Sequence, residues 1–341
     1  MSYTDFAVQQ IAALCKTPSP SGFTQMIREY LVKELKAIGY QPTVTVKGSV
    51  LAELGGQGNP LVLAAHVDTL GAMVRAIKAD GKIRFTKIGG FPENYIENEN
   101  VTIHTRTGKS CSGTVYLNGP AVHVYKDTAS RPRDDSNMEI VLDEVVKTKE
   151  DVQKLEIATG DFISFDSRTI VTDSGFIKSR HLDDKASAGI LLALAKMVKE
   201  GEVILGRKVT ILFTTYEEVG HGASAGIPQD TVEMISVDMG CVGDDLEADE
   251  FKVSICAKDS GGPYHYEVTS DLIEVAKTLQ LNYAVDIYPM YGSDVEATLH
   301  AGYDVKHGLI GPGVFASHGY ERTHRQGVEN TLKLLAGYVV K

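Results

Sequence analysis

This sequence has fewer basic than acidic residues and no long hydrophobic run. Each of these two features argues against a class of function. The 341 residues include 34 lysines and arginines against 45 aspartates and glutamates, so the formal net charge is −11 at pH 7. No basic stripe is present to neutralise phosphates, and we expect no nucleic-acid partner. No apolar run approaches the roughly 18 residues of a membrane span. The N-terminus lacks the basic and apolar regions of a signal peptide, so we expect no secretory leader.

The few cysteines carry no recognisable metal or redox motif. Cys15, Cys111, Cys241 and Cys256 are widely spaced and include no CxxC pair, which argues against a zinc ribbon or a redox motif. Buried free thiols in a reducing compartment are the simplest interpretation, and we therefore expect a cytoplasmic protein.

Most of the chain shows the alternating helix and strand patterns of an α/β domain. Helices are expected at 5–15, 24–38, 186–199, 271–279, 293–301 and 328–340. Strands are expected at 40–54, 61–68, 209–214, 234–237, 283–288 and 308–310. We therefore predict an α/β domain, with a mixed sheet flanked by helices, in residues 1–71 and 164–341.

The pattern changes between residues 72 and 163. Here the sequence consists of short strand-like segments separated by Gly, Asn, Asp or Pro. They cover 72–77, 82–88, 100–105, 111–117, 121–125, 138–143 and 161–166. Repeated short strands with turn signals are typical of a small barrel or sandwich. We predict that this stretch is an inserted, barrel-like β domain.

The segment 61–68 contains the first candidate site. Five apolar residues run directly into His66-Val67-Asp68, as expected of a strand buried on both faces. Ligands of open α/β sheets bind at the carboxyl ends of such strands. His66 and Asp68 project to the same side of an extended chain and suit a divalent metal. An ordinary polar loop after a core strand is the alternative.

Three further junctions repeat this pattern of polar residues beside an apolar element. Asp183 and Asp184 precede the helix at 186–199, where they could either bind metal or simply favour the helix N-terminus. Glu217 and Glu218 follow the strand at 209–214, and Asp238 follows the strand at 234–237. One glutamate could ligate a metal while its neighbour acts as a general base. Solvated strand ends are the alternative.

Two histidines near the C-terminus, His318 and His324, complete the candidate ligands. Two metal ions about 3.5–4 Å apart need one shared carboxylate and further protein ligands for each ion. Imidazole together with carboxylate favours zinc, cobalt or manganese over magnesium or calcium. The chain supplies such a set in His66, Asp183, Glu218, Asp238 and His318.

Taken together, the motifs resemble those of the TET/glutamyl (deblocking) aminopeptidases, which are dinuclear metallopeptidases. The resemblance covers nearly the whole chain, including the inserted β domain, and implies a zinc-peptidase-like fold. It is carried by HVD at 66–68, LDD at 182–184, EEVG at 217–220, VDMG at 237–240 and GSD at 292–294.

The resemblance implies a role for each metal ligand. Asp183 would bridge two ions and would be joined to Asp184 by a cis peptide bond. His66 would bind one ion, while Glu218 and Asp238 would each ligate a different one.

The resemblance also implies the catalytic residues and the last ligand. Glu217 would be the general base that takes a proton from the attacking water, and Asp68 would orient His66. The family pattern places the last ligand at His318, with His324 as the alternative. The loop after EEVG is one residue shorter than usual, and Ser317 or Ala316 stands where an arginine usually precedes that histidine. These departures leave the substrate preference open.

We therefore expect a metal-dependent aminopeptidase that acts on short peptides with two divalent ions, zinc before cobalt or manganese. The resemblance implies self-assembly, with a dodecamer as the family form, and the β insertion would serve subunit contacts and substrate access. Another dinuclear amide hydrolase, such as a carboxypeptidase or deacylase, is the alternative function. A self-assembling peptide-binding protein without activity is the remote one.

Overall fold

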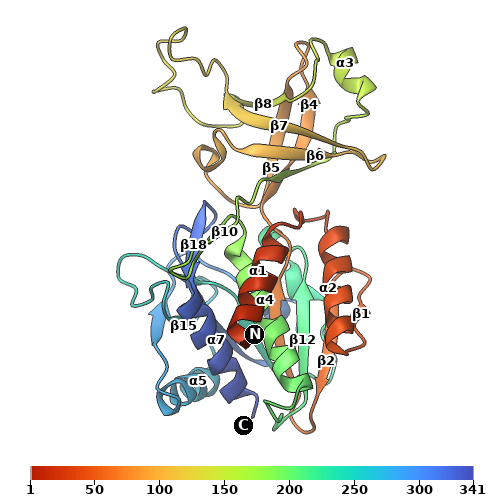
Figure 1. Cartoon of the computed structure of the whole chain (residues 1–341). Helices are drawn as coiled ribbons and strands as arrows, with labels where there is room; N and C mark the ends of the chain where they lie inside the picture. Colours follow the sequence, from red (N-terminus) through yellow and green to blue (C-terminus); the bar gives the residue numbers. More distant parts are fainter. Residues whose placement is uncertain (1, 341) are drawn as a thin grey trace. The chain divides into compact units, whose positions relative to one another are not determined.

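The computed structural model describes residues 2–340, which form two compact units (Figure 1). The first unit comprises the described parts of Met1–Asp68 and Arg168–Lys341, and the second comprises Thr69–Ser167. No helix among the described residues is long and apolar enough to cross a membrane.

A mixed sheet runs through the first unit. Its strands follow the order β1 (Thr43–Val44), β2 (Val50–Gly55), β12 (Val209–Thr214), β3 (Leu61–His66), β13 (Glu233–Val237), β17 (Lys306–Val314), β15 (Val253–Lys258) and β16 (Tyr283–Ile287). The four central strands from β12 to β17 are parallel, whereas β2 and β15 run antiparallel to their central neighbours. Short β14 (Gly240–Cys241) pairs with β17. The predicted mixed sheet is confirmed, although the sequence pattern did not reveal β15.

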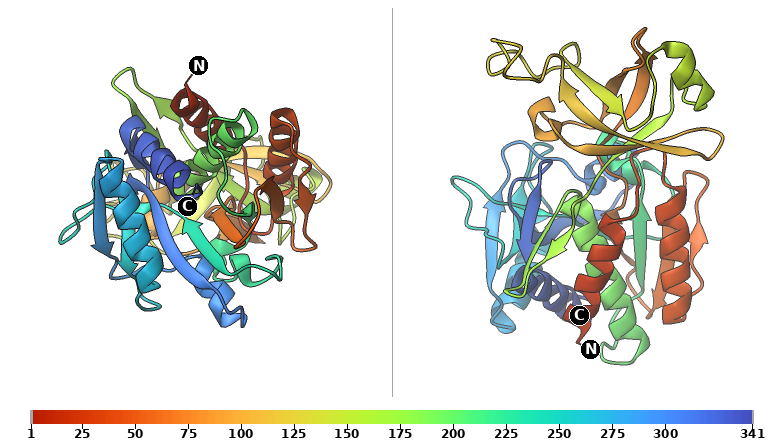
Figure 2. Two further views of the ribbon diagram at one scale, coloured as in Figure 1. Left: turned by 90° about the horizontal axis from the view of Figure 1, so that it is seen from below. Right: turned by 45° about the horizontal axis from the view of Figure 1, so that its top comes forward.

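Side chains of β3 alternate between two hydrophobic cores, one on each face of the sheet. Leu61, Leu63 and Ala65 belong to the larger core, and Val62 and Ala64 to the smaller one. The larger core is formed with the helices α1 (Tyr3–Cys15), α2 (Gln25–Ile38), α4 (Leu182–Lys199), α5 (Tyr266–Thr278) and α7 (Arg325–Tyr338). The opposite face is covered by α6 (Asp294–His300). Figure 2 shows the helices of the larger core packed beside the sheet from two further directions.

Helix α4 is the central helix of the larger core. All residues from Leu182 to Ala195 are buried, and α1, α2 and α7 pack against it. A helix that is apolar on nearly all sides must be covered all round. Its first turn departs from helical geometry at Asp183 and Asp184, which places these carboxylates at the edge of the core. A small antiparallel sheet of β10 (Ile170–Val171), β11 (Phe176–Ser179) and β18 (Glu321–His324) completes the unit.

The second unit is a closed six-stranded barrel, as its repeated short strands predicted. The strands are β4 (Gly71–Ile77), β5 (Ile83–Ile88), β8 (Met138–Leu142), β7 (Ser110–Leu117), β6 (Asn100–His104) and β9 (Phe162–Phe165). Helix α3 (Lys149–Lys154) lies between β8 and β9, and a short 3₁₀ helix (Glu93–Ile96) lies between β5 and β6. The expected strand at 121–125 is wrong, because this segment forms turns. Val122 and Val124 are each 70% exposed, so their alternation with polar residues reflects no buried face.

Candidate metal centre and active site

The candidate site residues meet where parallel strands end and helix α4 begins. His66 is the last residue of β3, and Asp238 directly follows β13, which pairs in parallel with β3. Glu217 and Glu218 follow β12, the other parallel neighbour of β3. The carboxyl ends of these three strands lie together, as the apolar runs in the sequence predicted.

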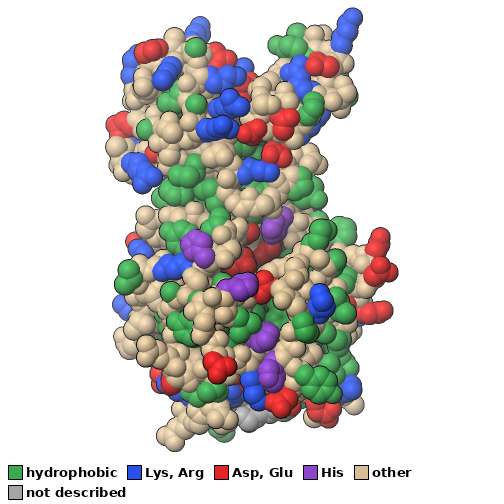
Figure 3. Space-filling model, turned by 180° about the vertical axis from the view of Figure 1, so that it is seen from behind, with side chains coloured by type: hydrophobic (Ala, Val, Ile, Leu, Met, Phe, Trp, Pro, Cys, Tyr) green, Lys and Arg blue, Asp and Glu red, His purple; other side chains and the backbone are tan. Residues whose placement is uncertain are grey.

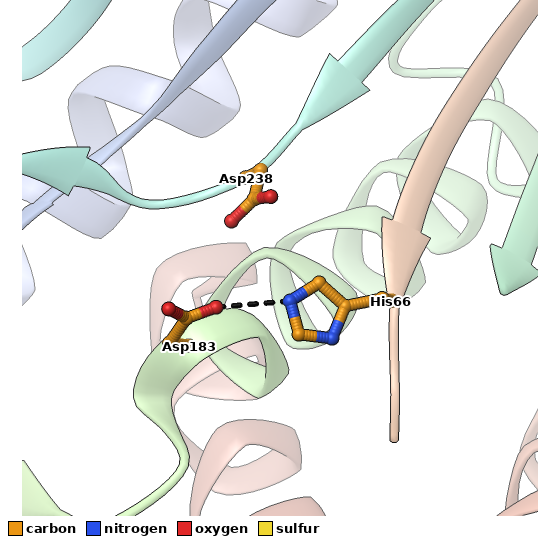
Figure 4. Close-up of side chains that lie close together, drawn as sticks. All are labelled: His66, Asp183 and Asp238. Atoms are coloured by element: carbon orange, nitrogen blue, oxygen red, sulfur yellow. Dashed lines mark hydrogen bonds and ion pairs between the residues drawn. The ribbon is translucent and has the colours of Figure 1, made fainter. Parts of the chain in front are cut away.

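Three buried side chains form the inner part of the site. Ligand atoms of His66, Asp183 and Asp238 all lie within 4.8 Å of one another. Figure 4 shows the His66 ring directed at Asp183. The carboxylate of Asp238 lies above these two side chains and is directed toward the space between them. The distance from His66 Nε2 to Asp183 Oδ1 is 2.9 Å.

The second oxygen of Asp183 faces a different histidine. His318 Nε2 lies 3.3 Å from Asp183 Oδ2 and 3.7 Å from Glu218 Oε2. Asp183 therefore lies between two nitrogen donors, with one carboxylate oxygen directed at each. Its peptide bond to Asp184 is cis, as the family resemblance implies.

Asp68 connects His66 to the loop that carries the two glutamates. Its carbonyl oxygen lies 3.0 Å from His66 Nδ1 and accepts the hydrogen of that nitrogen. Its carboxylate accepts hydrogen bonds from the backbone N–H groups of Glu217 and Glu218, at 3.1 and 3.4 Å, and from the Ser21 hydroxyl. With a proton on Nδ1, neutral His66 offers its Nε2 lone pair toward Asp183. Two acceptor atoms only 2.9 Å apart require a cation or a second proton between them.

The electrostatics of the site also call for a cation. Burial raises the pKa of Glu218 to about 8 and that of Asp238 to about 7, and in both cases the charge of Asp183 adds to the effect. Burial likewise raises the pKa of Glu217 well above its usual value. Burial opposes the charged form of His66, but the surrounding carboxylates outweigh it and raise the histidine pKa well above normal.

Several buried oxygen atoms have no protein donor. Among the described residues, Glu218 Oε1 and both carboxylate oxygens of Asp184 have no hydrogen-bond partner. Buried carboxylates without donors are costly unless a cation is bound nearby. The imidazole and carboxylate donors gathered here suit zinc, cobalt or manganese. The residues therefore fit the divalent ions that the sequence predicted.

His324 lies away from this cluster. Its Nε2 is 2.9 Å from the Ser174 carbonyl oxygen, and its Nδ1 accepts the backbone N–H of Gln326 at 3.1 Å. Its ring contacts Phe176 edge-on. Of the two candidate histidines, the structure brings His318 to the carboxylates.

Sequence reasoning missed one buried residue that supports the site. Glu321 Oε1 accepts the backbone N–H of His318 at 2.9 Å, and its Oε2 accepts that of Asp183 at 3.2 Å. One carboxylate thus fixes both residues relative to each other. Glu321 lies in a short strand, β18, without a motif of its own, so no sequence signal indicated this role.

Comparisons with known proteins identify the family of this chain. Residues 48–334 match the M42 glutamyl aminopeptidase family. YhfE of Bacillus subtilis (strain 168), which is named as a candidate aminopeptidase, is 46% identical over 334 residues, or 97% of this chain and 96% of YhfE. The glutamyl aminopeptidase of Lactococcus lactis subsp. cremoris is 28% identical over 217 residues, or 62% of this chain and 59% of that protein.

A solved structure shares the fold at low sequence identity. The TET1 peptidase of Pyrococcus horikoshii, which can assemble into a tetrahedron or a large octahedral shell, superposes with a TM-score of 0.86. The match covers 98% of this chain and 99% of that one, at 23% identity. The family match and the extensive identity to YhfE confirm the resemblance carried by the sequence motifs, and the chain belongs to the M42 glutamyl aminopeptidase family.

Proposed function

We propose that this protein is an aminopeptidase that removes N-terminal residues from short peptides with the help of two divalent metal ions. One observation carries the proposal: Asp183 directs one carboxylate oxygen at His66 and the other at His318. A carboxylate between two separate donor sets is the arrangement that a bridging ligand requires. Membership of an aminopeptidase family supports the reaction class.

The donors fall into two sets around the shared carboxylate. His66, Asp183 and Asp238 would hold one ion, because their ligand atoms lie within 4.8 Å of one another. Asp183, Glu218 and His318 would hold the other, because both carboxylates lie within 3.7 Å of His318 Nε2. When bound, the two ions, zinc before cobalt or manganese, would polarise the scissile carbonyl and lower the pKa of the attacking water.

Glu217 would act as the general base. Its Oε2 lies 3.7 Å from His66 Nε2, at the edge of the donor sets, and Asp68 holds its backbone N–H. The carboxylate would take a proton from the attacking water and then deliver it to the leaving amine. Asp68 would not touch the substrate, and would position both His66 and Glu217 through the hydrogen bonds described above.

The family suggests the oligomeric state of this protein, and its cysteine content suggests its cellular location. We propose that the chain forms a homo-oligomer, a dodecamer in its family form, with contacts between subunits and control of substrate access supplied by the inserted domain at 72–163. The cysteines Cys15, Cys111, Cys241 and Cys256 are all unpaired, which suits the reducing cytoplasm.

Metal add-back on aminoacyl p-nitroanilides tests this function. Chelated protein should be inactive, and activity should return with Zn²⁺, Co²⁺ or Mn²⁺. Glu217→Gln should keep its metal content and lower kcat by about 10²–10⁴-fold, because a carboxamide cannot accept the proton. Near-normal activity of this variant would refute the role of Glu217. Hydrolysis restricted to N-blocked or C-terminal substrates would instead indicate a deacylase or carboxypeptidase.

A further inference from the structure

A cavity of about 240 Å³ opens beside Glu217 in the first unit. One wall of the cavity is the loop after β12, which contributes Glu217 and Gly222. The other wall is helix α6, which contributes Glu296 and His300. Figure 3 shows the face of the molecule on which histidine and acidic side chains gather over this unit. Because Glu217 forms part of the wall, a substrate held for attack beside Glu217 can extend an attached group into the cavity.

The walls of the cavity are fixed by close packing. A Cβ atom at Gly222 would lie 2.0 Å from Asp294 Oδ1 and 3.0 Å from the Cα of Glu217, so only glycine fits there. The Asp294 carboxylate is already engaged, since it accepts the backbone N–H of Ala223 at 2.7 Å and the hydroxyl of Thr214. Asp294 therefore holds the loop, which leaves the carboxylate of Glu296 as the candidate contact for a ligand.

Glu296 has only part of its hydrogen-bonding capacity satisfied by the backbone. Its Oε1 accepts the N–H of Gly261 at 3.0 Å. Burial, followed by a hydrogen bond to neighbouring Asp259 and the negative charge of that residue, raises the pKa of Glu296 to about 7. Asp259 itself is nearly fully buried and accepts the Tyr264 hydroxyl. A positive charge in the cavity would relieve the repulsion between these two carboxyl groups.

The remaining lining offers no fixed positive charge. None of the described lining residues is lysine or arginine, and His300 is the exposed last residue of α6. An acidic side chain entering here would be desolvated beside carboxylates, and Lys47, the cation next to this loop, is already engaged by the carbonyl oxygens of His221 and Gly222. A basic side chain would gain a charge-assisted hydrogen bond to Glu296.

We propose that this cavity receives the side chain of the substrate's N-terminal residue, and that Glu296 selects lysyl and arginyl peptides over glutamyl and aspartyl peptides. The inference rests on the aminopeptidase function proposed above and names its substrate class. Glu296 is a specificity residue in this scheme and takes no part in the proton transfers of Glu217.

Three substrates and two variants test this selection. The metal-loaded protein is assayed with lysyl-, leucyl- and glutamyl-p-nitroanilide. The kcat/KM for the lysyl substrate should be higher than that for the glutamyl substrate by about tenfold or more. Glu296→Gln should lower lysyl kcat/KM by about tenfold and leave the leucyl value within about twofold. Glu274→Gln, a matched change on the exposed face of α5, should alter none of the three values.

Each contrary outcome points to a different failure. A wild-type preference for the glutamyl substrate would overturn the assignment of charge selectivity. Equal losses on all three substrates in Glu296→Gln would show a structural role and would also overturn it. Failure of the metal-loaded wild-type protein to hydrolyse any of the three would refute the proposed aminopeptidase function itself, and this inference with it.

Discussion

The two sides of Asp183 are held by very different parts of the fold. His66 ends a central strand and has a side chain that is only 2% exposed, whereas His318 lies on a loop and is 34% exposed. The His66 ring is fixed by the Asp68 carbonyl, while His318 has a left-handed backbone, with φ of 65°, and its N–H is held by Glu321. A rigid ligand loses little entropy on binding, so the His66 side should bind its ion more tightly.

Asp183→Ala should produce the largest effect, because it removes the carboxylate shared by both sides. The variant should lose both ions and lower kcat/KM by several orders of magnitude. Metal analysis after dialysis, compared with wild-type protein, gives the direct measurement. Two ions retained per chain would rule out the bridging role of Asp183.

His66→Ala and His318→Ala should distinguish the two sides. Loss of a direct ligand should weaken binding of the affected ion by more than about 100-fold, since even a partner of a ligand is typically worth 10–100-fold. His66→Ala should abolish the tight binding phase in calorimetric metal titrations, and His318→Ala should abolish the weak one. His324→Ala is the matched control and should retain both phases. A single phase in the wild type, or loss of both in His324→Ala, would contradict this division.

The same contrast explains how much of the site could be predicted from the sequence. His66 ends one apolar strand, Asp238 directly follows a second, and Glu218 lies four residues beyond a third, so the hydrophobic pattern that predicts the strands also indicates where the polar groups meet. The strand before His318, β17, is interrupted by glycine and proline in the sequence, so only the family pattern favoured His318 over His324. The sequence gives no hint of Glu321, because its function depends on backbone N–H groups more than a hundred residues apart, at Asp183 and His318.

The fold was predictable for similar physical reasons. Buried parallel strands such as β3 and β12 consist mostly of consecutive apolar residues, and these were recognised. β15 was missed because its apolar run is short: Ser254 interrupts it, and the strand ends with the small, half-buried Ala257 and the exposed Lys258. At 121–125, apolar and polar residues alternate as in a strand, but the valines are exposed. Alternation indicates a strand only where a core covers one face.

The smallest expected effect concerns the metal-free protein, in which the two sides should titrate differently. The pKa of Asp238, beside His66, is raised to about 7, and that of Glu218, beside His318, to about 8. Between the unfolded pKa near 4 and these values, the folded state binds more protons, so stability falls as pH rises. The Tm of chelated protein should therefore decline by roughly 2–5 °C between pH 5 and pH 8.

Calorimetry on two variants separates the contributions of these carboxyl groups. Asp238→Asn should remove the part of the decline that ends near pH 7, and the remaining decline should continue to about pH 8. Glu218→Gln should reduce the slope over the whole range up to about pH 8, while the contribution of Asp238, which ends near pH 7, and that of buried Glu321, whose pKa is also raised to about 8, remain. Saturating Zn²⁺ should flatten the profile of the wild type, because bound cations favour the ionised carboxylates at every pH in this range. A metal-free Tm that rises from pH 5 to pH 8 would show that the carboxyl groups on both sides ionise without a cation.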